Sequence, residues 1–137
     1  MLAAMGVDVG PADAPWRSEC ASHFAGRLTD VERFAAFVID DSHERELAAS
    51  AVGWIDLHLP GVDVPAEIGF IANVSTSPAH RRRGYARAVT EALVAWFRTE
   101  TPVRKIDLFA TPEGAPLYRS LGFAHPEGEA LRLRINP

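Results

Sequence analysis

Four arginines lie close together in the stretch SPAHRRRGYARAVTEAL, residues 77–93, at positions Arg81, Arg82, Arg83 and Arg87. Gly84 follows the first three, and the residues after it repeat apolar side chains at the spacing of an amphipathic helix. The first main-chain N–H groups of a helix have no partner inside it, and the helix dipole adds partial positive charge there. Such a turn binds anions, and neighbouring arginines make charge-assisted contacts to phosphate. The pattern predicts an anion site, best suited to a pyrophosphate.

The charge of the whole chain is opposite to that of the arginine cluster. Its 137 residues include 14 basic and 18 acidic ones, for a net charge of −4. A general nucleic-acid binder takes most of its affinity from a dominant basic surface, so nucleic acid is not an expected partner. An apolar content of 47% is enough for one core, and residues 1–137 are expected to form a single domain. A solvated charged turn is the alternative interpretation of the cluster.

The sequence offers little for metal or thiol chemistry. Cys20 is the only cysteine, so neither an internal disulfide nor a thiolate metal site can form. No pair of histidines has the spacing of metal ligands, and no metal is expected; the histidines are His23, His43, His58, His80 and His125. His80, beside the arginines, is expected to face solvent. No apolar run reaches the ~18 residues of a membrane span and no signal peptide is recognised, so a cytoplasmic protein without a membrane partner is predicted.

The remaining patterns predict a sheet covered by helices. Residues 1–14 are small and without a period, and are expected to form a loose arm. Alternating or β-branched runs predict strands, and apolar residues three and four apart predict helices. The expected strands are 33–40, 47–59, 66–76, 104–112 and 129–135, and the expected helices are 16–28, 84–100 and 113–122. This order, with a hairpin first, indicates a mixed-sheet α/β or α+β domain.

The motif around the arginines resembles that of a known superfamily. The Gly-Lys-Ser/Thr ending of one phosphate-binding loop and the three-glycine dinucleotide fingerprint are both absent. Arg81-x-x-Gly84-x-Ala86 is present, after a strand that ends in NVSTSP. Downstream, APLYRSLGF (115–123) resembles the Tyr-x-x-x-Gly-Phe ending of the last conserved helix of the GNAT superfamily of acyl-CoA-dependent N-acyltransferases. Residues 66–123 together resemble the core of that superfamily.

The resemblance implies a particular fold. Members are α+β proteins of three layers, in which helices flank a mixed, mostly antiparallel sheet. They usually open with a strand and a helix before the helix that corresponds to 16–28, where this chain has only the arm 1–14. The fold is therefore expected to be N-terminally shortened, unless the arm supplies a degenerate opening strand. That region helps to form the acceptor pocket in the family, so the resemblance leaves the acceptor open.

The resemblance also implies a cofactor site for acetyl-CoA. In the family, the strand before the motif splays from its neighbour and pairs with the pantetheine arm, which by position falls on Val74, Ser75 and Thr76; a plain strand is the alternative. Arg81, which opens the motif, is implied as cofactor-binding. The main-chain N–H groups that would hold the diphosphate are those of Arg82, Arg83, Gly84, Tyr85, Ala86 and Arg87. Thr111 stands where relatives often carry an asparagine that contacts the cofactor.

Two residues are implied as catalytic. Tyr118 matches the family tyrosine usually assigned as general acid toward the CoA sulfur, and the alternative is a tyrosine that only packs. Glu67 begins the strand that leads to the site, where relatives often carry a glutamate that deprotonates the amine directly or through water. A solvated carboxylate at a strand end explains Glu67 equally well. Asp56 and His58 share a strand face and either line the acceptor pocket or form an exposed polar face.

The function that the resemblance implies is N-acetyl transfer from acetyl-CoA to a primary amine, by direct attack in a ternary complex. A non-catalytic acyl-CoA-binding or sensor domain is the alternative. The acceptor, a small amine or a peptide amine, stays open, although the acidic balance mildly favours a cationic one. An exposed last strand 129–135 would be compatible with a homodimer.

Overall fold

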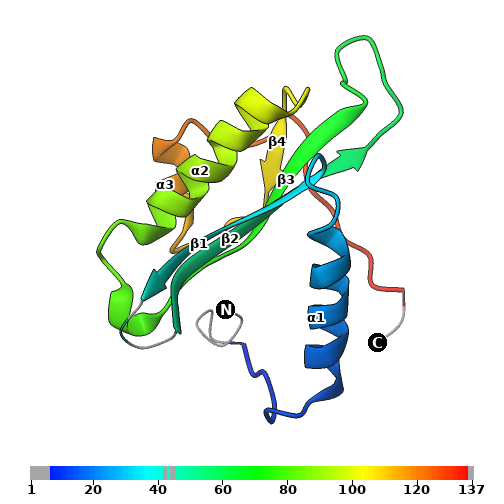
Figure 1. The fold of residues 1–137 in the computed structure, drawn as a ribbon. Helices are drawn as coiled ribbons and strands as arrows, with labels where there is room; N and C mark the ends of the chain where they lie inside the picture. The colour runs from blue at the N-terminus through cyan, green and yellow to red at the C-terminus, as the bar shows by residue number, and fades with distance from the viewer. Residues whose placement is uncertain (1–6, 42, 44–45, 136–137) are drawn as a thin grey trace.

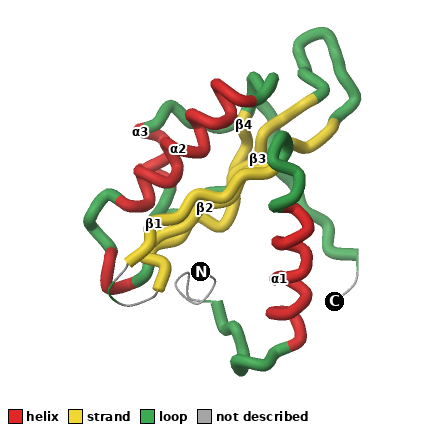
Figure 2. Tube along the Cα trace, viewed as in Figure 1, coloured by secondary structure: helices red, strands yellow, loops and turns green. Residues whose placement is uncertain are grey.

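The computed structural model describes residues 7–41, 43 and 46–135 (Figures 1 and 2). Its elements in chain order are α1 (Pro15–Arg27), β1 (Phe34–Asp41), β2 (Glu46–Leu57), β3 (Glu67–Thr76), the 3-10 turn η2 (Pro78–His80), α2 (Tyr85–Glu100), β4 (Ile106–Leu108) and α3 (Ala115–Ser120). The expected hairpin, the third strand and all three helices are present at nearly the expected positions. The hairpin turn lies partly outside the described residues.

The four strands form one sheet in the order β1-β2-β3-β4. The first two pairings are antiparallel and the β3–β4 pairing is parallel. Figure 1 shows α2 and α3 on one side of the sheet and α1 on the other. The expected α+β class, with a mixed and mostly antiparallel sheet between helices, is confirmed.

The core lies between the sheet and the predicted apolar face of α2. Val89, Leu93 and Phe97 are buried on that face. They approach the sheet closely because β2 and β3 carry glycines opposite them. A Cβ added at Gly53 would lie 3.0 Å from the Leu93 side chain, and one added at Gly69 would lie 2.7 Å from the Phe97 ring. These glycines therefore set how near α2 sits to the two central strands.

An irregularity in β3 changes which side chains point toward α2. Asn73 has a φ of 53°, and the β2–β3 register shifts between Ser50 and Val52. An extra residue of this kind is a β-bulge, and it reverses the alternation of side chains beyond it. Val74 consequently packs against the core cluster, whereas the Ser75 hydroxyl lies 3.5 Å from that of Ser50.

Two strand predictions need correction. The expected strand 104–112 is hydrogen-bonded as a strand only over Ile106–Leu108. The expected strand 129–135 is not a strand: no regular structure is assigned there, and Leu131, Leu133 and Ile135 are 85–86% exposed. An alternating pattern forms a strand only where a sheet edge accepts it, and this segment pairs with no strand of the described chain. The homodimer suggested by that strand stays a prediction.

The N-terminal part covers the other face of the sheet only lightly. The described part of the arm, residues 7–14, contains no strand, and β1 lies at the sheet edge. No residue of α1 is buried, but Phe24 packs edge-on against Phe34 with ring centroids 5.5 Å apart. Within the described ranges, no helix combines the length and apolar character needed to cross a membrane.

Candidate active site

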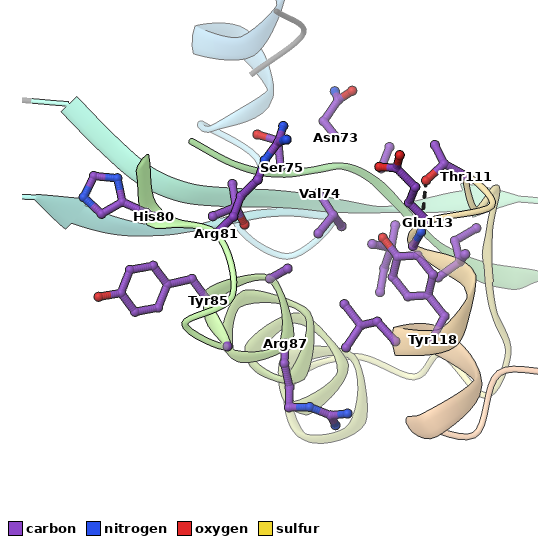
Figure 3. Close-up of a pocket in the computed structure, with 18 of the residues that line it drawn as sticks. Asn73, Val74, Ser75, His80, Arg81, Tyr85, Arg87, Thr111, Glu113 and Tyr118 are labelled. Atoms are coloured by element: carbon purple, nitrogen blue, oxygen red, sulfur yellow. Dashed lines mark hydrogen bonds between the residues drawn. The ribbon is translucent and has the colours of Figure 1, made fainter. Parts of the chain in front are cut away.

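A cleft opens where β3 and β4 separate. Their register pairs Gly69 with Ile106 and Ile71 with Leu108, and the pairing ends there. Beyond that point the strands diverge around a cleft of about 980 Å³, bounded by β3, η2, the start of α2, the loop after β4 and α3. Figure 3 shows side chains from these elements around the cleft. The family resemblance predicted this splay.

Most of the predicted site residues line the cleft together. They are Val74, Ser75, Thr76, Arg81, Arg82, Gly84, Tyr85, Ala86, Arg87, Thr111 and Tyr118. Arg83 and Glu67 do not line it. The cleft thus gathers residues from two separate stretches of the sequence, 71–87 and 108–118. Ser75 and Thr76 lie on its β3 wall, where the Thr76 hydroxyl is buried with no hydrogen-bond partner in the described part of the chain.

The arginine turn, residues 81–87, carries a run of unpaired main-chain donors. The first helical hydrogen bond at the start of α2 runs from the N–H of Ala88 to the carbonyl of Gly84. Within the described chain, no main-chain hydrogen bond is made by the N–H groups of Arg82, Arg83, Gly84, Tyr85, Ala86 and Arg87. These are the groups predicted for the diphosphate. Unsatisfied donors at a helix start are the physical basis of an anion site.

Backbone conformation holds these donors in a turn. Gly84, the residue before α2, has a φ of 80°, and Arg82 has a φ of 63°. Left-handed residues inside a turn bring successive N–H groups onto one concave side, which favours anions. A Cβ at Gly84 would meet nothing within 4 Å, so conformation rather than crowding requires glycine at this position.

The arginine side chains have different roles. Those of Arg82 and Arg83 are exposed and form no ion pair in the described residues. The Arg87 guanidinium instead donates to Glu91 at 3.3 Å and to the Ser120 hydroxyl at 2.6 Å, which joins α2 to α3. Figure 3 shows it pointing away from the cleft. Arg87 therefore offers its main-chain N–H to the cleft.

The prediction that His80 faces solvent is wrong. The residue is 6% exposed, its Nε2 lies 2.7 Å from Oδ2 of Asp41, and its ring stacks with Tyr85 at a centroid distance of 6.3 Å. The ring Nδ1 is buried without a partner in the described structure. Because β1 ends at Asp41 just beside η2, a residue that is distant in sequence buries His80. No local sequence signal could have shown this contact.

Tyr118 reaches into the cleft from α3 (Figure 3). Its ring packs against Phe123 with centroids 6.0 Å apart, so Tyr118 does have the packing contact that the sequence analysis gave as the alternative. Gly114 also lies against the ring, since an added Cβ would be 3.2 Å from it. Burial raises the pKa of the Tyr118 hydroxyl above its usual value of 10.0. The hydroxyl therefore keeps its proton at neutral pH.

Of the described carboxylate residues, Glu113 alone lines the cleft, and Glu67 and Asp56 lie outside it. Glu67 is at the other end of β3 from Val74, and its carboxylate lies 3.7 Å from the guanidinium of Arg33. Glu113, which the sequence reasoning did not single out, lines the cleft in the loop that leads to Tyr118. Asp56 accepts a hydrogen bond from the Trp54 indole at 2.9 Å. No group of three or more possible metal ligands occurs among the described His, Cys, Asp and Glu residues.

Comparison with known proteins agrees with the fold. The profile of the Acetyltransferase (GNAT) family matches residues 7–123, which is most of the chain. The chain therefore belongs to the GNAT family of acetyltransferases, and acetyl transfer is the activity of its class. No curated protein sequence matches it.

Solved structures of the same fold come from several organisms. A predicted acetyltransferase from Clostridium acetobutylicum, solved with acetyl-CoA, is 23% identical with a TM-score of 0.77, over 93% of this chain and 79% of that one. Glucosamine-6-phosphate N-acetyltransferase from Arabidopsis thaliana is 16% identical with a TM-score of 0.74, over 97% and 88%. A GCN5-related N-acetyltransferase from Ralstonia eutropha is 21% identical with a TM-score of 0.70, over 85% and 74%. At these identities the likeness shows the shared fold.

Proposed function

We propose that the protein transfers the acetyl group of acetyl-CoA to a primary amine, by direct attack in a ternary complex. The observation that carries this proposal is the run of unpaired N–H groups in the arginine turn, at the mouth of a cleft between two diverging strands. Diphosphate is an anion that suits these donors and the exposed guanidinium groups of Arg82 and Arg83. Family membership makes the diphosphate of coenzyme A the natural occupant.

The pantetheine arm would lie along β3, where the strand has no neighbour on the β4 side. Val74, Ser75 and Thr76 line the cleft there, and Thr111 lines it from the loop after β4. Backbone groups beyond the Asn73 bulge are free of a β4 partner, because the β3–β4 pairing ends at Ile71. An N–H group in this stretch can polarise the thioester carbonyl as negative charge develops on its oxygen.

Acid and base would act from opposite sides of the thioester. The amine nitrogen forms a bond to the carbonyl carbon, the carbon–sulfur bond breaks, and the sulfur takes a proton from the Tyr118 hydroxyl. The attacking amine loses a proton, which we assign to Glu67 through water, because Glu113 lies on the Tyr118 side where the sulfur leaves. A thiol has a pKa of ~8.5, so the acid assists the reaction without being essential.

A covalent enzyme intermediate is not required. Cys20, the only cysteine, is exposed on α1 and does not line the cleft. The Ser75 hydroxyl lies 3.5 Å from that of Ser50, and among the described residues no hydrogen bond joins it to a histidine, a lysine or a carboxylate that could activate it. Direct attack of the amine on the thioester is therefore the simpler route, because it needs no nucleophilic side chain of the protein.

The position of Glu67 outside the cleft favours a second candidate, an acyl-CoA-binding domain without transfer activity. Calorimetry with acetyl-CoA, followed by measurement of free thiol across a panel of amines, separates the two. Binding with thiol release that depends on the amine supports the enzyme. Binding without release for any amine supports the sensor, and the absence of binding would remove both.

A further inference from the structure

Four aromatic side chains cross the sheet in one line. Phe34 of β1 is the register partner of Trp54 in β2, and Trp54 is the partner of Phe70 in β3. Phe109 follows β4. The ring centroids of Trp54 and Phe70 are 4.9 Å apart, and those of Phe70 and Phe109 are 5.7 Å apart. These four residues are called the aromatic row.

The aromatic row lies on the sheet face opposite α2. Gly53 and Gly69 point at the Phe97 ring of α2, and successive residues of a strand point to opposite faces. Trp54 and Phe70 therefore face away from α2, toward the side that carries α1. This face is the less covered one, because α1 buries none of its own residues.

One end of the row is closed and the other is open. Phe34 is 7% exposed and is covered by Phe24 of α1, whereas Trp54 and Phe70 are half-buried and Phe109 is 68% exposed. Phe109 is also a wall of the cleft. The rings of Trp54, Phe70 and Phe109 thus form a continuous aromatic surface that reaches the cleft. Exposed apolar surface that adjoins a cleft commonly marks a binding site.

Two arginines lie over this row. The guanidinium carbon of Arg132 is 5.3 Å from the Phe109 ring centre, and that of Arg27 is 5.7 Å from Trp54. Neither forms an ion pair with a carboxylate in the described chain. A guanidinium that stacks by its face keeps its N–H edge for a planar anion such as a carboxylate. The open end of the row therefore combines an aromatic platform with an anion-binding edge.

Resting on the proposed function, we propose that the aromatic row binds the acceptor and that the acceptor is an aromatic amine which also carries a carboxylate. Its ring would lie on Phe109 and Phe70, its carboxylate would meet Arg132, and its amine would face the cleft. The negative net charge of the chain alone would favour a purely cationic acceptor. The guanidinium groups of Arg27 and Arg132, which form no ion pair with a described carboxylate, instead favour an acceptor with a negative group at this face.

The test compares three acceptors. Tryptophan and tryptamine share the aromatic ring and the amine, but only tryptophan carries a carboxylate. Leucine carries the amine and the carboxylate but no aromatic ring. Free thiol release from acetyl-CoA by the full chain gives kcat/KM for each. We expect tryptophan to exceed both others by about tenfold or more, the size of a charge-assisted contact or of an aromatic platform. Because the amines of the probes differ in pKa, their kcat/KM values are not directly comparable within one protein. The decisive quantity is therefore how the ratio of two kcat/KM values changes between the wild type and a variant.

Arg132→Ala should bring the tryptophan-to-tryptamine ratio down about tenfold, and Arg134→Ala, the same change two residues further on, should leave it unchanged. Phe109→Ala should lower kcat/KM for tryptophan and tryptamine more than for leucine. Equal ratios in the wild type and Arg132→Ala would overturn the carboxylate contact. Preference for aliphatic amines would overturn the aromatic platform.

Calorimetry with acetyl-CoA separates failure of this inference from failure of the proposed function. If acetyl-CoA binds saturably and some other amine is acetylated, but neither tryptophan nor tryptamine is, the inference is overturned and the proposed function stands. No cofactor binding overturns the function and the inference with it. Circular dichroism on each variant identifies loss caused by unfolding.

Discussion

The arginine turn and the aromatic row are the two surfaces that meet at the cleft, and they are made of different atoms. The turn presents main-chain N–H groups from consecutive residues, in a conformation set by Gly84 and by the start of α2. The row presents side chains, one from each strand or its end, brought together by register. A main-chain N–H donor is present whatever side chain the residue carries, whereas the shape and chemistry of the aromatic row change with every substitution in it.

This difference matches what each surface has to recognise. A diphosphate is the same group in every acyl-CoA, so a surface that depends little on side-chain identity is sufficient to bind it. An acceptor differs from one enzyme to the next, and side chains are the means of selecting it. The following changes test whether the two surfaces act separately.

Glu67→Gln is expected to have the largest effect, a fall in kcat/KM of about 100-fold, because a positioned general base contributes roughly that much. Free thiol release at saturating acetyl-CoA measures it, and the cofactor Kd should not change. Glu113→Gln is the matched change on the cofactor side of the cleft and should cost little. A larger loss of kcat/KM in Glu113→Gln than in Glu67→Gln would place proton removal on the same side as the leaving sulfur.

Gly84→Val is expected to weaken acetyl-CoA binding about 30-fold, or about 2 kcal/mol, because a β-branched residue is strained at a φ of 80°. Calorimetry gives the Kd directly. Gly128→Val is the control, since Gly128 has no positive φ and an added Cβ would meet nothing within 4 Å. Equal Kd values for the two variants would mean that the turn does not hold the cofactor.

Tyr118→Phe is expected to lower kcat about tenfold and to leave the Kd of acetyl-CoA unchanged, because the hydroxyl acts on the leaving sulfur and the ring keeps its packing. Burial raises the pKa of Tyr118 above 10.0, so the hydroxyl stays protonated as the pH rises toward that value. Any alkaline decline in wild-type activity from this group should therefore begin at a higher pH than it would for an ordinary tyrosine. Full turnover in Tyr118→Phe would remove the acid role.

The sequence predicted the arginine turn better than the rest of the site, for a physical reason. A helix start, a glycine and a charge cluster are local features, so the donors of residues 82–87 could be named without knowing the fold. Strands and helices with a strong period were predicted for the same reason. The strand predicted at 129–135 is absent from the structure, because a strand also needs a sheet edge to pair with, and alternation does not reveal whether such an edge is available.

Contacts between distant segments could not be read from the sequence. The aromatic row depends on the register of three strand pairs, and the reversal at Val74 depends on a bulge at Asn73 whose only local sign is an asparagine. The burial of His80 depends on Asp41 of the edge strand β1, which lies 39 residues away in the sequence. Each of these needs the structure, because its physical cause is a neighbour that is remote in the chain.

His80 offers the finest test of the difference between the two surfaces. Its ring joins Asp41 at the end of β1 to Tyr85 at the start of α2, and it immediately precedes the arginine turn. His80→Ala should therefore loosen the turn and raise the KM for acetyl-CoA about fivefold, or about 1 kcal/mol, with little change in kcat. His80→Gln, which keeps a donor for Asp41, should recover part of this loss, and His43→Ala is the exposed histidine control.

The informative comparison uses S-acetyl-pantetheine, which has the thioester but no diphosphate. If His80 acts through the turn, its loss cannot matter to a substrate that makes no contact with the turn, so the KM for S-acetyl-pantetheine should be the same in His80→Ala and wild type. A parallel rise in both KM values would show that His80 supports the whole cleft. In that case the main-chain surface would depend on the packing around it as strongly as the aromatic row does.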